Sequence, residues 1–506
     1  MVQEEQVARY LREAYMRPIM PKVPWYTRVI EWVKSLNIPD KIAIVAENLY
    51  YAAMKLKAFI RRHMPQPDVQ TSASRRDPDV LERYAAVLED RDQKQKLFGV
   101  ALILCAIVFV LLAVMFILSG GFGPKAEYQV SEADPSVRLT SADISDRMTP
   151  AHVTFCAVGD NLANETVLEF ADSWAGEMGD GWYDFVPFYR EIKPVVSGYD
   201  IAFINQETVL AGVTDSIGYM GYPSYNTPDS IADAVVDAGF DVVNFNSNHS
   251  YDLWTSGIER SQAVWSQYPE ITLIGSYTGP EDRANVRVIE SHGIKVAFLS
   301  YSQFQNARSQ SDLPNDWYAV PFDEDGLIRD YEIARSKADI VVVYLHGGTE
   351  YEHWPDEWEQ YAAQFCADLG VDLVIGSHVH VIQPVVWLTR SYNGNLMPCA
   401  FGLGDFLSGY YDYPDLVLSG LFSCDFTEQK DGSYAVENVV WTPLLEYRTT
   451  SYDGSVDGRV RLVKNITVAE ASQNEMYRYL DPNADPFLWP YLATQEVMSP
   501  WVTLGI

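Results

Sequence analysis

The sequence predicts a mixed α/β domain over residues 150–450, and this prediction depends on alternating strand and helix patterns and on the length of the segment. Short apolar runs that suit buried strands alternate with segments in which apolar residues have helical spacing, such as 228–238 and 357–369. This alternation is typical of an α/β sandwich. About 300 residues are enough to enclose one large hydrophobic core.

The first 96 residues have a helical pattern. Asp40 follows Pro39 and can cap a helix in which apolar residues recur at helical spacing from Ile42 to Phe59. Basic residues near the end of this helix suit the inner face of a membrane, but a place in a small cytoplasmic bundle explains the pattern equally well. Residues 65–80 contain several Pro and Ser and predict a linker.

Residues 97–118 predict a single transmembrane helix. They include no Asp, Glu, Lys or Arg, and a helix of this length crosses a hydrocarbon core of about 30 Å. The run lies too far along the chain for a cleaved signal peptide. Because Arg91, Lys94 and Lys96 precede it, residues 1–96 are predicted to be cytoplasmic and the large domain extracytoplasmic, in the cell membrane. We expect residues 119–149 to form a linker and residues 451–506 to pack on the domain as a C-terminal extension.

Charge is distributed unevenly along the chain. The net charge is +4 for residues 1–96 and −36 for residues 97–506, out of −32 for the whole chain. Clustered cations are needed to bind phosphate backbones, so this acidic domain excludes nucleic acid as a partner. The charge also opposes simple electrostatic capture of a polyanion. It either serves solubility alone or is reversed locally by bound metal ions that admit an anionic substrate.

Polar side chains of one chemical kind follow five strand-like runs. Carboxylate, amide and imidazole groups at successive strand ends are the ligands that a pair of divalent metal ions requires. The most informative stretch is Gly-Ser-His-Val-His at 376–380, where two imidazoles can reach one cluster. By itself, however, a His-x-His pair at a strand end can be structural rather than metal-binding. The predicted metal ligands are Asp160, Glu207, Asn248, His346, His378 and His380.

The sequence indicates different roles for four polar residues near these strand ends. Glu207 follows a fully apolar run, where a carboxylate is costly unless it is paired or metal-bound. His249 is directly beside Asn248 and is a candidate ligand or a candidate proton donor. Asp252 and Glu350 are expected to orient imidazoles rather than to bind the metal.

Six blocks in this order resemble the CapA-type poly-γ-glutamate capsule biosynthesis proteins, which are related to the calcineurin-like metallophosphatases. The resemblance covers roughly residues 150–410, with Asp160 in the first block. Three positions depart from it: Gln206 replaces a leucine, Val379 a proline, and Asp405 an asparagine, which adds negative charge near the site. Leu162 stands where the metallophosphatases have a histidine ligand. The remaining blocks are NQE (205–207), NSNHSYD (246–252), HGGTEYE (346–352), GSHVHVIQP (376–384) and GLGDF (402–406).

The resemblance implies a metallophosphatase-like four-layer α/β/β/α sandwich with one or two divalent ions (Mn, Zn or Fe). It implies a metal-dependent hydrolase that cleaves a phosphoester or a γ-glutamyl amide, with His249 as proton donor and Asp252 fixing its ring. The implied partners are the membrane, an anionic envelope polymer or a phosphorylated precursor, and capsule synthesis membrane proteins. A different reading is a non-catalytic accessory subunit of a capsule polymer synthesis or export complex, which the long cytoplasmic region favours.

The cysteines carry little functional information. Cys156 and Cys366 lie in apolar patterns that suggest burial, and no cysteine lies in a motif with histidine. Cys399 and Cys424 lie in strand-like runs, and the spacing leaves open whether they form a disulfide.

Overall fold

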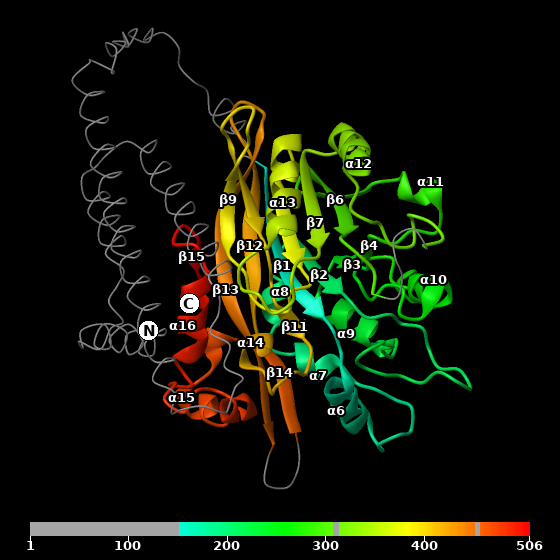
Figure 1. Ribbon diagram of the computed structural model, residues 1–506, viewed down its shortest axis with the longest axis vertical. Coiled ribbons are helices and arrows are strands. Elements are labelled where there is room, and N and C mark those ends of the chain that lie inside the picture. Colours follow the sequence, from blue (N-terminus) through cyan, green and yellow to red (C-terminus); the bar gives the residue numbers. More distant parts are fainter. Residues whose placement is uncertain (1–150, 307–312, 451–455, 506) are drawn as a thin grey trace, which may run out of the picture. The chain divides into compact units, whose positions relative to one another are not determined.

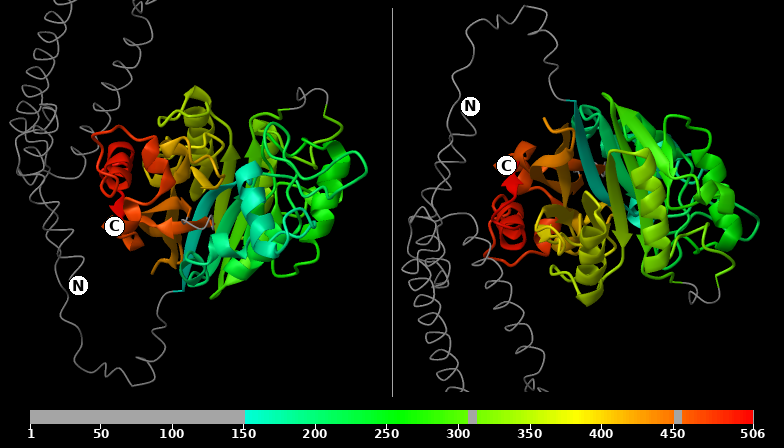
Figure 2. Two further views of the ribbon diagram at one scale, coloured as in Figure 1. Left: turned by 90° about the horizontal axis from the view of Figure 1, so that it is seen from below. Right: turned by 90° about the horizontal axis from the view of Figure 1, so that it is seen from above.

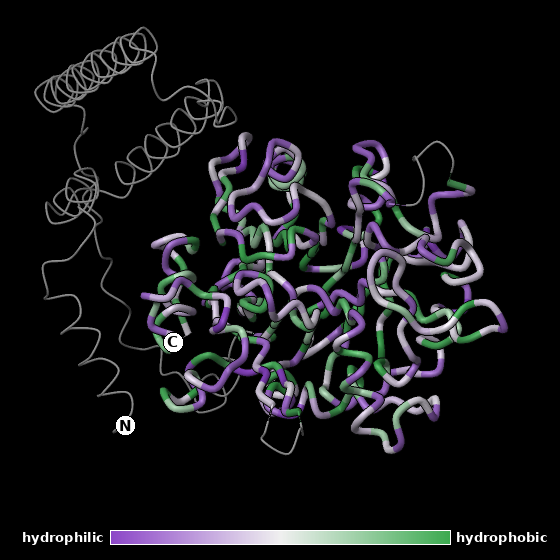
Figure 3. The backbone as a smooth tube through the Cα atoms, turned by 60° about the horizontal axis from the view of Figure 1, so that its bottom comes forward, coloured by the Kyte–Doolittle hydropathy of each residue, from purple (hydrophilic) through white to green (hydrophobic). Residues whose placement is uncertain are grey.

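The computed structural model describes residues 151–306, 313–450 and 456–505 (Figure 1). The predicted cytoplasmic region, the span at 97–118 and the linker at 119–149 all lie outside these residues. Within the described ranges, no helix is both long and apolar enough to span a bilayer. Figure 3 shows hydrophobic and hydrophilic stretches interleaved along this part of the chain.

The first of two sheets contains nine strands among the described residues. The parallel strands β1, β2, β3 and β4 form one half, and the antiparallel strands β12, β13 and β14 continue the sheet beyond β1. Two short strands pair in parallel beside this path, β11 with β1 and β15 with β13. The bounds are β1 His152–Asn161, β2 Ile201–Gln206, β3 Val242–Asn244, β4 Thr272–Ile274, β11 Asp405–Leu407, β12 Leu418–Glu428, β13 Tyr434–Thr450, β14 Val456–Leu462 and β15 Thr503–Leu504.

The second sheet contains six strands in the order β5-β6-β7-β8-β10-β9. Strands β6, β7, β8 and β10 are parallel, and β5 and β9 are antiparallel edges. The central strand β7 is buried along its whole length, which explains its nearly continuous apolar sequence. The bounds are β5 Arg287–Ser291, β6 Ile294–Ser302, β7 Ile340–His346, β8 Leu373–Ser377, β9 Val385–Thr389 and β10 Leu396–Ala400.

The two sheets pack face to face around one hydrophobic core. Phe155 of β1 lies 6.2 Å from Phe298 of β6, and Phe203 of β2 lies 5.4 Å from Tyr344 of β7, measured between ring centroids. Figure 2 shows the cyan strand β1 beside the green strands of the second sheet. These contacts bring the carboxyl ends of β1, β2, β7 and β8 together at one edge, and the mixed α/β class is confirmed.

Helices lie on the outer faces of both sheets (Figure 1). On the second sheet, α12 packs against β6 and β7, and α13 packs against β7, β9 and β10. On the first, α7 contacts β14 and α9, whose apolar side chains join the core. The bounds are α6 Glu165–Ala175, α7 Val186–Tyr189, α8 Lys193–Val196, α9 Ser230–Ala238, α10 Trp254–Trp265, α11 Pro280–Arg283, α12 Glu324–Lys337, α13 Glu357–Leu369, α14 Pro414–Val417, α15 Val468–Ala471 and α16 Trp489–Val497.

Both helices expected from apolar spacing form. The one predicted over 228–238 is α9, and the one predicted over 357–369 is α13. A reciprocal capping box fixes the start of α13, because the Asp356 side chain accepts from the backbone of Glu359 while the Glu359 carboxylate accepts from Asp356.

The last described segment is part of the first sheet. Strand β14 covers Val456–Leu462 and ends where a 3-10 turn begins at Val463, after which Thr467 caps α15. Helix α16 packs against β13. Residues from β14 and α16 contribute to the hydrophobic core.

Four buried cysteines are free. Cys399 lies in β10 of the second sheet and Cys424 in β12 of the first. The disulfide that the spacing left open between these two residues does not form in this structure.

Candidate metal centre

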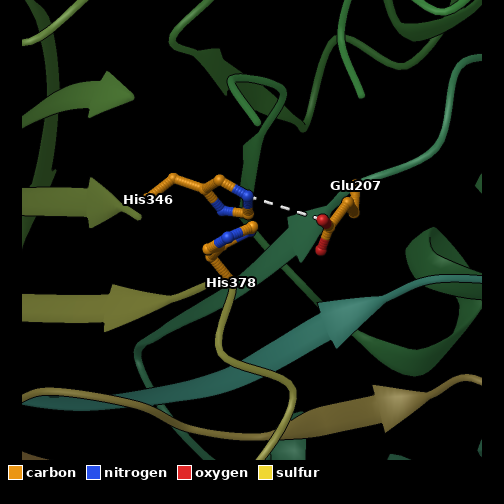
Figure 4. Close-up of side chains that lie close together, drawn as sticks. All are labelled: Glu207, His346 and His378. Carbon is orange, nitrogen blue, oxygen red and sulfur yellow. Dashed lines mark ion pairs between the residues drawn. The ribbon is translucent and has the colours of Figure 1, made fainter. Parts of the chain in front are cut away.

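One group of candidate ligands joins the two sheets at the ends of β2, β7 and β8. Glu207, His346 and His378 each offer one ligand atom, and these atoms lie within 4.8 Å of one another. Nε2 of His346 is 3.4 Å from Oε1 of Glu207, as Figure 4 shows. The same nitrogen lies 2.8 Å from Oδ1 of Asn248. This cluster therefore combines two imidazoles, one carboxylate and one amide oxygen.

A second group shares Glu207 with the first. Ligand atoms of Asp160, Glu207 and His380 lie within 4.8 Å of one another, and all three residues are buried. Nδ1 of His380 lies 3.8 Å from Oδ2 of Asp160 and 2.9 Å from Oδ1 of Asp405. All six predicted ligands are therefore brought together in two adjoining groups. The sharing of Glu207 is the arrangement expected of a carboxylate that bridges two ions.

Glu350 lies in a third set with His378 and His380. It is exposed, unlike the other carboxylates of the site, which are fully buried. The structure thus places Glu350 at the solvent side of the two histidines, within reach of the centre.

The two histidines of the 376–380 stretch do not lie on a strand. Strand β8 ends at Ser377, and His378 and His380 have φ angles of +100° and +61°, which are rare for residues other than glycine. The directions of their side chains are therefore set by this turn rather than by the pleat of β8. Both imidazoles lie at the site, with ring centroids 5.8 Å apart, and Val379 between them is buried. Strained backbone of this kind is concentrated at functional sites.

At two glycines of this edge, the backbone lies very close to that of a neighbouring segment. A Cβ atom on Gly159 would lie 1.8 Å from the carbonyl oxygen of Gly404, and one on Gly376 would lie 2.1 Å from that of Phe401. Any side chain at either position would push neighbouring backbone away. Glycine at 159 thus lets β1 deliver Asp160 next to the segment that carries Asp405.

A buried chain of amides holds Asp160 in place. Asn205 donates from Nδ2 to Oδ1 of Asp160 at 2.7 Å, and Asn244 donates to Oδ1 of Asn205 at 2.6 Å. Ser300 in turn donates to Oδ1 of Asn244 at 2.6 Å. The backbone N–H of His378 donates to Oδ2 of Asp160 at 3.2 Å. These bonds fix the carboxylate of Asp160 before any ligand arrives.

Several buried polar atoms of the centre have no hydrogen-bond partner among the described residues: both carboxylate oxygens of Glu207, Oδ2 of Asp405, Nδ1 of His378 and Nδ2 of Asn248. Buried polar groups are rarely left unpaired, so each requires an explanation. Carboxylate oxygens and imidazole nitrogens are ligands of divalent cations. The residues present therefore fit a metal ion.

Burial and neighbouring charges shift the pKa values of four groups at the centre. Burial, with the nearby charges of Asp160 and Asp405, raises the pKa of Glu207 well above its usual value. Burial also lowers the pKa of His346 and of His378 well below the usual range, so both rings are held neutral, the form that binds metal. Burial opposes protonation of His380, but Asp405 and Asp160 raise its pKa to about 9.

His249 lies beside the centre, outside the ligand groups found among the described residues. Its Nδ1 is 2.7 Å from Oδ2 of Asp252, which also accepts the backbone N–H of Tyr225 at 2.8 Å. Its Nε2 is 3.3 Å from Nδ2 of Asn306. The ring of Tyr225 packs perpendicular to the imidazole at 4.7 Å. The predicted pairing of His249 with Asp252 is present.

Sequence reasoning missed Asn306, Tyr225 and the role of Asp405 at this centre. Asn306 follows β6, and the apolar run at 296–299 before it is a signal of the same type as those used for the other strands. Tyr225 lies in a loop between β2 and α9, and no local pattern marks it. Leu162 is buried, and its backbone N–H donates to Leu407 of β11.

Comparison with known proteins gives a consistent family. Residues 154–410 match the family model described as bacterial capsule synthesis protein PGA_cap. The chain is 26% identical over 172 residues to the PGA biosynthesis protein CapA of Bacillus subtilis (strain 168), which covers 34% of this chain and 43% of that protein. It is 24% identical over 240 residues to the capsule biosynthesis protein CapA of Bacillus anthracis, which covers 46% of this chain and 55% of that protein. The chain thus spans about half the length of the curated relatives it matches.

Solved structures that are similar include the NAD nucleotidase NadN of Haemophilus influenzae, at 9% identity and a TM-score of 0.37, covering 69% of this chain and 57% of that one. A putative 5′-nucleotidase of Staphylococcus aureus is 12% identical with a TM-score of 0.34, covering 60% and 56%. The family assignment depends on the sequence match. Because that match extends over half of the chain and contains every predicted ligand, the chain belongs to the bacterial capsule synthesis protein family PGA_cap.

Proposed function

We propose that this protein is a metal-dependent hydrolase of the bacterial cell envelope, acting in the biosynthesis of a capsule polymer such as poly-γ-glutamate. The observation that carries the proposal is the Glu207 carboxylate, which is fully buried between two groups of ligands and has no hydrogen-bond partner in the part of the chain that the structure describes. A buried charge of this kind is costly unless a cation offsets it. The capsule context is supported by the family and by the names of the two Bacillus relatives.

Divalent ions such as Mn²⁺, Zn²⁺ or Fe²⁺ held by these residues would supply Lewis acidity, which suits hydrolysis of a phosphoester or a γ-glutamyl amide. One ion would be held by Glu207, Asn248, His346 and His378, and another by Asp160, Glu207 and His380. The amide chain through Asn205 keeps Asp160 aimed at its ion. The substrate would be an anionic envelope polymer or a phosphorylated precursor, whose charge the ions offset in this acidic domain.

His249 would give a proton to the leaving group. The Asp252 carboxylate beside Nδ1 fixes the ring, so that Nε2, near Asn306, is the nitrogen that exchanges the proton. Neither His249 nor Asp252 belongs to a ligand group found among the described residues, so proton transfer and metal binding are assigned to different residues.

The central test compares three variants of the full chain, supplied with Mn²⁺ and Zn²⁺, in metal content and in hydrolysis of a phosphodiester and of poly-γ-glutamate. We expect His249→Ala to keep its metal and to lose about 10²–10⁴-fold in turnover, the usual worth of general acid catalysis. His380→Ala should lose both its metal and its turnover. His353→Ala is the control, since Nδ1 of His353 pairs with the carbonyl of Ile382 instead of a ligand group.

Two results would contradict this scheme. Wild-type protein without stoichiometric metal would refute a metal-dependent function. Metal-loaded protein that turns over neither substrate would favour the other candidate, a non-catalytic accessory subunit that joins a capsule synthesis or export complex. That candidate is supported by the 96 residues that precede the predicted membrane span, because a simple anchor needs far fewer.

We also propose that the chain is a single-pass protein of the cell membrane, with residues 1–96 inside and the metal centre outside. The support is the uncharged run at 97–118 and the basic residues before it. Protease added to intact protoplasts should digest the large domain and spare an epitope placed at the amino terminus. Protection of the large domain in intact protoplasts, with digestion only after lysis, would reverse this topology.

A further inference from the structure

Asp405 brings a third buried carboxylate to the centre. Strand β11 pairs in parallel with β1, and Asp405 lies opposite Asp160 in that register. The two residues therefore lie side by side on neighbouring strands. Both side chains are fully buried.

The two oxygens of the Asp405 carboxylate have different surroundings. Oδ1 lies 2.9 Å from Nδ1 of His380, a nitrogen that is itself 3.8 Å from Oδ2 of Asp160. Oδ2 is buried without a hydrogen-bond partner among the described residues. One oxygen thus orients the imidazole, and the other is left without a hydrogen-bond partner among the described residues. The ligand groups of the described residues, whose atoms lie within 4.8 Å of one another, do not include Asp405, so binding an ion requires its side chain to move toward that ion.

The negative charge around this oxygen favours a bound cation. Asp160, Glu207 and Asp405 are each fully buried, and the described ion pairs join these three only to histidines, never to Lys or Arg. Buried carboxylates in such a cluster are stable only when paired or metal-bound. Strand β1 supplies the candidate ligand Asp160, and Leu162, directly after the strand, is apolar.

We infer that Asp405 binds, through Oδ2, the metal ion held by Asp160, Glu207 and His380. The inference rests on the proposed function, since it requires that the centre binds divalent metal. It also makes the two ions chemically different. Three carboxylates and one imidazole suit a harder ion such as Mn²⁺, whereas two imidazoles with one carboxylate and one amide suit Zn²⁺.

A different result is expected if Asp405 only orients the His380 ring. The variant Asp405→Asn distinguishes this orienting role from metal binding. The amide keeps an oxygen that can accept from His380, but its NH₂ group cannot bind a cation. If Asp405 only positions the ring, this variant should bind Mn²⁺ as the wild type does. If Asp405 is a ligand, one ion should be weakened.

The test is titration of the metal-free full chain with Mn²⁺, following free Mn²⁺ by its EPR signal. We expect Asp405→Asn to weaken the more tightly bound Mn²⁺ by about 10–100-fold, the usual effect of losing a group at a metal site. His378→Ala should spare that ion and weaken Zn²⁺ at the other position. Asp415→Asn, which removes a charge near His353, should bind as the wild type does.

The outcomes distinguish this inference from the function on which it rests. Wild-type protein that binds Mn²⁺ with an affinity unchanged in Asp405→Asn overturns the ligand role and leaves the metal centre intact. Wild-type protein that binds neither Mn²⁺ nor Zn²⁺ overturns both. Unfolding curves of the metal-free variants establish that each chain is folded before titration.

Discussion

Replacing Glu207 by glutamine is expected to remove both metal ions in a single step. Glu207 is the residue common to the two buried ligand groups, so no other single substitution reaches both positions. An amide has one weak ligand oxygen and no charge, and the loss in affinity should be at least about 10–100-fold at each position. Elemental analysis of the purified full chain, with hydrolysis measured in parallel, checks this expectation.

The same substitution should stabilise the metal-free protein. Both Glu207 oxygens are buried without hydrogen-bond partners among the described residues, and Asp160 and Asp405 disfavour the charged form. An amide of equal size has no charge to desolvate or to repel these carboxylates, so it should relieve a cost on the order of 1–3 kcal/mol. Glu446→Gln is a matched control. Glu446 is equally buried, but its oxygens accept the backbone N–H groups of Ser408 at 3.0 Å and Gly409 at 2.9 Å.

We therefore expect opposite changes in the free energy of unfolding, measured by urea denaturation after chelation. Glu207→Gln should raise it and Glu446→Gln should lower it. If Glu207→Gln retained two ions per chain, the carboxylate would not be a shared ligand, and the division of the centre into two groups would be wrong.

Gly159→Ala is expected to destabilise the domain by about 3 kcal/mol or more. The added Cβ atom would lie 1.8 Å from the Gly404 carbonyl oxygen, which is backbone and cannot rotate away. Overpacking of this kind usually costs about 1–3 kcal/mol and more when backbone must move. Because β1 and the segment before β11 would separate, Asp160 and Asp405 would also move apart, and metal affinity should fall.

Gly279→Ala is the control for the effect of alanine itself. No atom lies within 4 Å of a Cβ at Gly279, and its φ of 169° is extended backbone that any residue adopts. Its stability should stay within about 0.5 kcal/mol of the wild type. Equal midpoints in urea for the two alanine variants would show that the close approach at Gly159 is not needed.

The composition of the candidate centre could be predicted from the sequence because parallel strands end at one edge. Apolar runs indicate where the strands lie, and the first polar residue after each run must lie at that edge. Asp160 and His346 follow this rule, whereas Glu207 lies two residues beyond Asn205, the first polar residue after its run. The rule requires no knowledge of the turns between the strands.

Other features of the centre depend on turns and on distant pairing, which local patterns do not encode. The positive φ angles of His378 and His380 turn both rings to one side. The register that places Asp405 opposite Asp160 joins residues that are far apart in the chain. Asn306 and Tyr225 come from loops, whose paths follow from packing rather than from periodicity. The predictions for residues 1–149 lie outside the described part of the chain and stay predictions.

The centre draws on both sheets and on chain segments from Asp160 to Asp405, so nothing shorter than the nearly complete domain can form it. Contacts between residues so distant in sequence carry a large loop-closure entropy and form late in folding. A chain emerging from the ribosome or threading through a membrane would therefore carry the ligands without the site. If the domain is exported as we propose, it would acquire its ions only after folding on the outer side, and the metal available there, rather than in the cytoplasm, would decide its content.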